Sequence, residues 1–328
     1  MKFRRRLLIA SGSLLALSLA VFAGFRWMSA LPAAIRLLPE GELLVYGNPR
    51  LIHLLDSKTS YSPSSDPDYQ SFIDQTGIRF ERDLDEVAMS MRNPGPEAET
   101  SSLWIGRFDV DRLRNYLQKL ASTSERYADK TIFAVFHDGR PVRVCILANN
   151  EIAVTNTSSA EPIHGMIDKF RNTALAGRGP YLAEHYYRYV PFRSAAWLVY
   201  RPSQGGAGQL PEGLSFDFLQ NTTGVVSLQY PLWVSRPLSL KAEIFTDSEA
   251  NAVDVAESAQ NFLSLYRSVS QSLGLRGADR DVKKVFDSIQ VDQKDNRAIL
   301  TASIPQAFLK KIASDAQAPS SSGSANKP

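Results

Sequence analysis

The longest uncharged stretch of the sequence lies at the N-terminus, where Leu7–Phe25 contains no ionisable side chain. As a helix its 19 residues measure about 28 Å, and a bilayer hydrocarbon core is about 30 Å thick. Basic residues that flank such a helix stay on the cytoplasmic side, and four precede it: Lys2, Arg4, Arg5 and Arg6. We therefore predict a single-pass helix in the inner (cytoplasmic) membrane, with the N-terminus in the cytoplasm and residues 26–328 outside.

The same N-terminal pattern also fits a cleaved signal peptide, which has a basic start and a shorter apolar core. Cleavage near Ala23, among small residues, would leave a secreted or periplasmic protein. Trp27 follows the apolar run and favours the uncleaved anchor, because tryptophan is enriched at membrane interfaces. We predict a membrane anchor or signal segment over residues 1–25 and a connector over residues 26–36.

The rest of the chain alternates between short apolar runs and amphipathic segments. Apolar or alternating runs predict strands, and apolar residues spaced three or four apart predict helices. Predicted strands cover residues 43–46, 86–92, 102–108, 131–136, 141–147, 151–155, 196–200, 225–230, 238–245, 285–291 and 298–304. Helices are predicted to begin at Asp66, Asp109, Ser158, Thr246 and Pro305. Asp138 and Gly139 lie between two apolar runs, which indicates a hairpin.

A strand, a helix and a hairpin follow one another twice, over residues 102–147 and again over residues 238–304. This order lacks regular β–α alternation, so it favours antiparallel sheets with helices packed on one face. We predict an α+β fold made of two related βαββα-like halves, preceded by one N-terminal membrane helix. The halves are expected to pack together or to share a sheet.

Composition suggests where these halves begin and end. The first half is predicted over residues 37–201 and the second over residues 214–313. Between them, residues 202–213 are rich in Gly, Pro and Gln, which is typical of a surface loop. Residues 314–328 contain no large apolar side chain, so we predict a disordered tail.

Charge and cysteine content narrow the function classes. The chain has 37 Lys and Arg against 34 Asp and Glu, a net charge of +3, of which the N-terminal segment contributes four positive charges. The ectodomain is therefore close to neutral, which argues against a nucleic-acid partner, because that binding depends on neutralising phosphates. Cys145 is the only cysteine, so no internal disulfide can form, and its apolar neighbours predict a small buried residue.

Few residue patterns in the sequence suggest chemistry. The four histidines lack the spacing of a metal site, and neither a nucleophile elbow nor a phosphate-binding loop is present, so we predict no metal and no cofactor. Two carboxylates at a cleft could carry out acid–base catalysis if one were desolvated. Asp83 with Asp85 or Glu86 is the candidate pair, and a polar turn before a strand is the alternative interpretation.

The most distinctive candidate for a binding surface is the aromatic and basic stretch from His185 to Arg201. Tyr, Trp and Arg dominate recognition surfaces, because they offer large and rigid contact areas. The alternative is that Trp197 and Tyr200 belong to the core while the others line a loop. The predicted ligand- or partner-binding residues are Tyr186, Tyr187, Arg188, Tyr189, Phe192 and Arg193.

Several short segments resemble uncharacterised bacterial envelope proteins of a domain-of-unknown-function family. They are Leu38–Gly41, Leu44–Tyr46, Thr76–Ile78, Phe80–Val87 and Gly106–Phe108, and the similarity in element order extends over residues 37–313. The resemblance implies an N-terminal membrane segment and a repeated α+β ectodomain. It carries no catalytic residues to transfer.

These observations predict a membrane-tethered extracytoplasmic binding or scaffold protein rather than an enzyme. The expected partners are the membrane, through Leu7–Phe25, and an envelope protein or glycan. Two alternatives are an envelope hydrolase that uses the carboxylates near Asp83, and a carrier of an apolar ligand held between helices and sheet.

Overall fold

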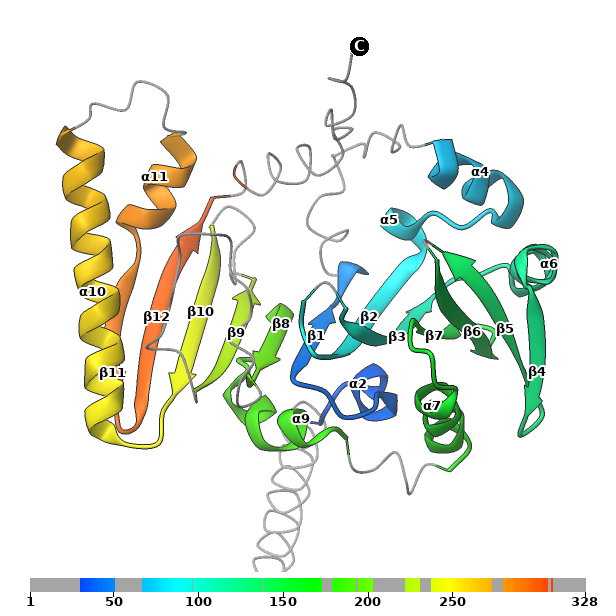
Figure 1. Cartoon of the computed structure of the whole chain (residues 1–328). Coiled ribbons are helices and arrows are strands. Elements are labelled where there is room, and N and C mark those ends of the chain that lie inside the picture. The colour runs from blue at the N-terminus through cyan, green and yellow to red at the C-terminus, as the bar shows by residue number, and fades with distance from the viewer. Residues whose placement is uncertain are drawn as a thin grey trace, which may run out of the picture.

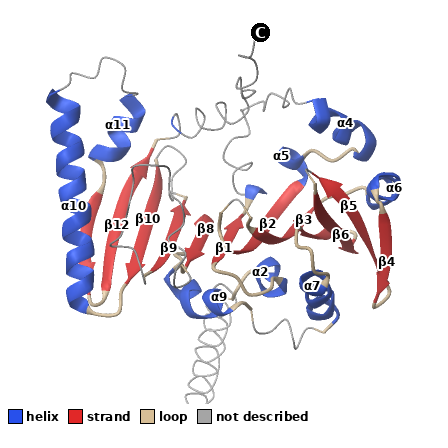
Figure 2. Cartoon of the chain, viewed as in Figure 1, coloured by secondary structure: helices blue, strands red, loops and turns tan. Residues whose placement is uncertain are grey.

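The computed structural model describes residues 30–50, 67–95, 97–137, 139–172, 179–192, 194–202, 222–230, 237–272, 280–305 and 308. Over these residues the chain has an α+β fold, in which helices pack on a single sheet of 12 antiparallel strands (Figure 1 and Figure 2). The predicted fold class and the antiparallel arrangement are confirmed. The predicted membrane segment, Leu7–Phe25, lies outside the described residues.

The sheet is continuous from one end of the molecule to the other. Its order is β11-β12-β10-β9-β8-β1-β2-β3-β7-β6-β5-β4. Its strands are β1 (Leu43–Gly47), β2 (Leu84–Arg92), β3 (Glu99–Gly106), β4 (Thr123–Tyr127), β5 (Lys130–His137), β6 (Arg140–Ala148), β7 (Glu151–Thr155), β8 (Ser194–Tyr200), β9 (Thr223–Gln229), β10 (Leu238–Phe245), β11 (Gln290–Lys294) and β12 (Arg297–Ile304). The centre of the sheet joins distant parts of the chain, since Leu44 of β1 lies opposite Val199 of β8.

The described helices are mostly short. They are α2 (Ala33–Leu37), α4 (Pro67–Thr76), α5 (Phe80–Asp83), α6 (Val110–Leu120), α7 (Glu161–Arg171), α9 (Tyr181–Tyr186), the 3-10 turn η1 (Tyr187–Tyr189), α10 (Glu249–Ser272) and α11 (Arg280–Asp287). Local sequence explains several helix ends. Asp109 caps α6 by accepting a hydrogen bond from the Arg112 N–H, and Gly77 follows α4 with a φ of 72°.

Helices cover both faces of the sheet, which corrects the prediction of a single covered face. Neighbouring residues of a strand point to opposite faces. On β3, Leu103 belongs to the main core with α2 and α7, whereas Trp104 packs on the opposite face against the cluster formed by α6. Figure 1 shows α2, α7 and α9 on one side of this sheet and α4, α5 and α6 on the other. The order of elements cannot distinguish these arrangements, because a connection can cross either face.

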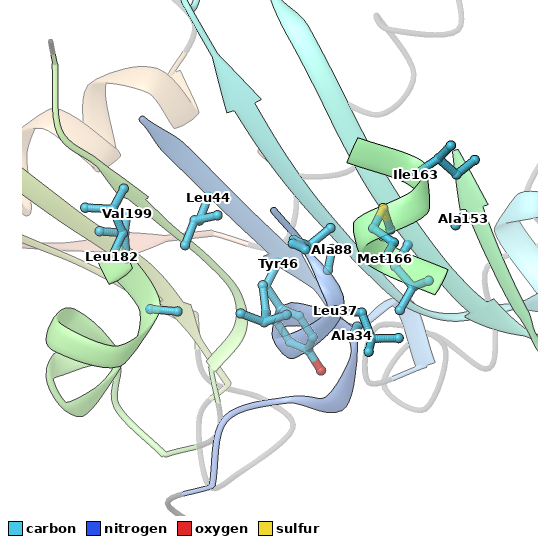
Figure 3. Close-up of a cluster of buried hydrophobic side chains, with 14 of the residues drawn as sticks. Ala34, Leu37, Leu44, Tyr46, Ala88, Ala153, Ile163, Met166, Leu182 and Val199 are labelled. Atoms are coloured by element: carbon cyan, nitrogen blue, oxygen red, sulfur yellow. The ribbon is translucent and has the colours of Figure 1, made fainter. Parts of the chain in front are cut away.

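The main core lies under α2, α7 and α9 (Figure 3). Residues from both sides of the loop predicted at 202–213 contribute to it, including Leu44, Val225 and Phe245. The last part of the predicted connector also lies in this core, because Ala34 and Ile35 of α2 are fully buried. The folded domain therefore incorporates the chain that precedes its first strand.

Three local predictions were wrong and one strand was missed. The helix predicted to begin at Thr246 begins at Glu249, where Ser248 accepts the Asn251 N–H. Val285 was assigned to a strand but lies in α11, where the Phe286 ring stacks on Tyr266 of α10 with centroids 4.1 Å apart. The helix predicted to begin at Ser158 begins at Glu161, and Ser159 rather than Ser158 accepts the Glu161 N–H. Strand β4 was missed because its residues are polar and almost all exposed, so no apolar alternation marks it.

Candidate binding surface

Helix α9 and the turn η1 present one buried side and one exposed side. Pro180 precedes α9, and Leu182 and Ala183 are buried against the sheet. The exposed side chains follow at helical spacing: Tyr181, Glu184, His185 and Arg188. We refer to these four as the α9 surface. Tyr181 is 46% exposed, and its ring stacks on His185 at a centroid distance of 3.9 Å.

The three predicted tyrosines of this region are half-buried and contact the core. The rings of Tyr186 and Tyr189 pack on Phe245 of β10, with centroids 5.1 and 4.5 Å apart. The ring of Tyr187 lies 5.5 Å from Trp197 of β8. Their rings thus hold α9 and η1 on the sheet, which leaves only part of each tyrosine available to a partner.

The other predicted residues of the stretch differ in exposure. Arg188 is exposed, and its guanidinium lies over the Tyr189 ring, 4.8 Å from the centroid. Phe192 is 63% exposed and is the most accessible of the predicted aromatic residues. Arg193 lies outside the described residues. The predicted set is therefore divided between a packed tyrosine cluster and an exposed rim.

A buried ion cluster lies beside the tyrosines and was not predicted. Glu243 of β10 is 2% exposed and accepts hydrogen bonds from Lys241 and from Arg297 of β12, the latter at 2.8 Å. The Arg297 guanidinium also lies 5.1 Å from the centroid of Tyr189. Arg297 is 54 residues from Glu243, so only the pairing of β10 with β12 brings the two together.

The start of α9 lies directly beside the start of the domain. A Cβ atom on Gly179 would lie 2.8 Å from the Leu31 side chain, so glycine permits this close approach. The Tyr181 N–H donates to the Glu40 carboxylate, with a shortest N–O distance of 2.9 Å. Arg36 of α2 is half-buried, and no hydrogen-bond partner is found for its Nε atom among the described residues. The α9 surface is therefore adjacent to the point where the chain enters the domain.

Asp83, the first carboxylate of the predicted catalytic pair, is engaged by arginine. Asp83 is buried and accepts two hydrogen bonds from the Arg82 guanidinium, each of 2.7 Å, and one from the Arg79 N–H. Burial alone would raise the pKa of Asp83, but these hydrogen bonds and the positive charges of Arg82 and Arg107 outweigh it, so the pKa is lowered. Asp83 is thus held ionised in a structural ion pair.

Glu86 has different neighbours from Asp83. Its side chain interacts with the Tyr46 hydroxyl, and burial raises its pKa, with a further contribution from the charge of Asp85. Glu151 faces the same side of the sheet, because Glu86 and Glu151 both lie opposite Ile105. Burial raises the pKa of Glu151, and the charge of Glu86 raises it further. Glu151 was missed because it is 65 residues from Glu86 and follows an ordinary turn.

A surface pocket beside β2 and β3 has a volume of about 200 Å³, much of it open to solvent. Its lining residues are mainly polar, among them Glu40, Ser90, Arg92, Glu99, Ser101 and Thr157. Ligand pockets usually exceed about 300 Å³ and are mainly apolar. Within the described ranges, no group of three or more His, Cys, Asp or Glu could hold a metal ion. Cys145 is fully buried, as predicted, and burial raises its pKa to about 12.

Among the residues that the structure describes, no helix is both long enough and apolar enough to span a bilayer. No protein-family model matches the sequence, and no curated protein matches it.

Three solved structures of TP0453 are similar to this chain. Crystal forms I and IV match with TM-scores of 0.46 and 0.47, and each match covers 89% of this chain. Crystal form III matches with a TM-score of 0.46 over 88% of this chain. The matches cover 98–99% of TP0453, and the sequences are 12% identical in each case.

Proposed function

We propose that this chain is a membrane-tethered extracytoplasmic binding protein that acts through its surface rather than through a catalytic centre. The observation that supports this most directly is the burial of Ala34 and Ile35 of α2 in the main core. The predicted anchor ends at Phe25, so only a few residues separate it from chain that is packed inside the ectodomain. The tether is therefore short, and the ectodomain stays close to the membrane.

The contacts of Asp83 argue against its use in hydrolysis. A general acid needs a raised pKa, whereas the pKa of Asp83 is lowered by its contacts with Arg82, so Glu86 is left without the partner that the predicted catalytic pair requires. A carrier of an apolar ligand would need a large apolar cavity, whereas the pocket beside Ser90 and Ser101 is small and has charged residues in its lining. The exposed rim of Arg188 and Phe192 has the residue types that recognition surfaces use.

Membrane fractionation of the full chain in a bacterial host tests the tether. We expect the intact protein in the membrane fraction after carbonate extraction, with a mass that includes residues 1–25. Replacement of Leu14 and Leu17 by Arg should release it, because each central arginine costs about 2.5–3.5 kcal/mol on insertion scales. A mature protein that lacks residues 1–23 and is released in soluble form would contradict the proposal.

Photo-crosslinking tests whether the ectodomain binds through the exposed rim. A photoreactive residue at position 192 should crosslink to a constituent of the envelope, because Phe192 is largely exposed. The matched control is position 136, since Phe136 is 64% exposed and lies on β5 in a different part of the sheet. Equal or absent crosslinking at the two positions would argue against this rim as the binding surface.

A further inference from the structure

We infer that the α9 surface lies in the lipid headgroup layer of the membrane that holds the predicted anchor, and that it orients the ectodomain there. The inference rests on the proposed tether and names the partner of this surface. The α9 surface consists of Tyr181, Glu184, His185 and Arg188.

The length of the tether limits how far the α9 surface can move from the bilayer. Six chain steps separate Phe25 from Leu31, and at about 3.6 Å per step they reach at most about 22 Å. Leu31 in turn packs against Gly179, two residues before α9 begins. The headgroup layer occupies the outer 5–7 Å or so of each side of the bilayer. A short tether keeps the local concentration of the surface high, so a weak affinity for lipid is sufficient.

The direction in which α9 faces agrees with this arrangement. Leu182 and Ala183 point into the core, so Tyr181 and His185 point away from the sheet. Helices α2, α7 and α9 lie together on one side of the sheet, and α4, α5 and α6 lie on the opposite side (Figure 1). The proposed tether joins the domain next to α2. Because α2 and α9 lie on the same side of the sheet, this side is the one closest to the membrane.

The chemistry of the α9 surface suits lipid headgroups. Tyrosine prefers the membrane interface, because its ring is apolar and its hydroxyl can remain hydrated. The exposed Arg188 guanidinium lies over the Tyr189 ring, on the same exposed side of the helix as Glu184. The Arg188 guanidinium can pair with a headgroup phosphate, and Glu184 keeps the surface close to neutral, so the contact does not depend on anionic lipid.

Depth measurements on the full chain in vesicles test the inference. The full chain with His185→Cys carries a fluorophore and is reconstituted into phosphatidylcholine–phosphatidylglycerol vesicles that contain a nickel-chelating lipid, which quenches fluorophores near the headgroups. The native Cys145 is fully buried, so it should not be labelled. The matched control is Lys119→Cys, an exposed position on α6 on the opposite side of the sheet. We expect quenching at position 185 to be at least three times that at position 119.

A second variant separates lipid contact from tethering. Adding Tyr181→Ser and Arg188→Glu to His185→Cys should reduce quenching at position 185 at least twofold, while flotation of the vesicles with bound protein stays unchanged. Equal quenching at positions 185 and 119 in protein that still floats would overturn the inference and leave the tether intact. Failure of the full chain to float would overturn the proposed tether itself. Protection of position 185 only when envelope proteins are added would identify a protein partner and also overturn the inference.

Discussion

At the residue scale, the most informative side chains are buried charges whose partners are distant in sequence. Glu243 is nearly inaccessible and is neutralised by Lys241 and Arg297. A buried carboxylate without partners would be strongly unfavourable, since desolvation disfavours the charged form. The position of Arg297 between Glu243 and the Tyr189 ring therefore links β12 to η1 through one guanidinium group.

Replacing Arg297 by Met should destabilise the protein by about 2–3 kcal/mol, because Glu243 would lose one of its two charged partners. Methionine preserves much of the side-chain packing of Arg297, so the lost stability reports mainly the lost ion pair with Glu243. Urea denaturation of the full chain in detergent would measure it. Arg114→Met is the matched control, since its pair with Asp111 is exposed and should contribute less than about 0.5 kcal/mol. Equal losses of stability in the two variants would contradict the role of Arg297 as a stabilising partner of Glu243.

The raised pKa of Glu86 predicts how the stability of the fold depends on pH. Burial raises its pKa, so the folded state binds this proton more tightly than the unfolded state does. Its contribution is fully present below the ordinary glutamate pKa of about 4.3 and is lost as pH rises through the raised value. Asp83 has the opposite sign, because its lowered pKa stabilises the fold above about pH 3.9 and that stability is lost on further acidification.

Glu86→Gln should therefore make the free energy of unfolding fall less steeply as pH rises above the ordinary glutamate pKa of about 4.3. The amide oxygen of Gln can still accept a hydrogen bond from the Tyr46 hydroxyl, so the fold should be preserved. Denaturation midpoints at pH 5, 6 and 7 provide the measurement, with Glu257→Gln, an exposed position on α10, as the control. An unchanged pH dependence in Glu86→Gln would show that another group dominates this range.

At the scale of single elements, α2 is more important than its five residues suggest. It precedes the first strand, yet Ala34 and Ile35 are fully buried and contact the core that α7 and α9 also enclose (Figure 3). Lys169 of α7 adds a hydrogen bond to the Leu38 carbonyl at the end of α2. A short helix of this kind is not stable alone, so packing must maintain it.

Replacing Ile35 by Ala should lower the free energy of unfolding by about 3 kcal/mol, because it leaves a cavity in a closely packed region. Leu120→Ala, at the exposed end of α6, is the control and should cost well under 1 kcal/mol. Chemical denaturation of the full chain distinguishes the two. If Ile35→Ala were as mild as the control, α2 would be a peripheral connector rather than part of the core.

At the scale of the whole molecule, one sheet contains strands from both predicted halves of the chain. The pairing of β8 with β9 continues the sheet across residues 202–213, where composition places a boundary. Phe245 of β10 lies in the same core as Leu44 of β1, and the rings of Tyr186 and Tyr189 pack on it. The contacts therefore favour unfolding as one unit.

Phe245→Ala should lower the stability of the full chain by about 3–4 kcal/mol in a single transition. Far-UV circular dichroism and tryptophan fluorescence should shift together, because the same core holds β10 and the tyrosines beside Trp197. Two separate transitions, with only one of them affected, would instead indicate that the halves unfold independently.

Local patterns along the chain were sufficient to predict much of the secondary structure. Strand β7 and strand β10 match their predicted limits, Asp109 caps α6, and Gly139 has the positive φ that a hairpin turn requires. These features depend on residues close in sequence, whose spacing alone carries the information. Edge strand β4 was not predicted, because its polar residues have no buried face to mark a period of two.

The sequence by itself determined the α+β class, the antiparallel pairing, the near neutrality of the chain after its N-terminal segment and the presence of an aromatic and basic stretch before β8. Tertiary structure decided that helices cover both faces, that Tyr186 and Tyr189 pack on Phe245, and that Glu86 faces the same side of the sheet as Glu151 rather than joining Asp83. These features depend on which strands pair and in which register. That choice is made by long-range burial, because a side chain is turned inward or outward only when its strand has found its neighbours.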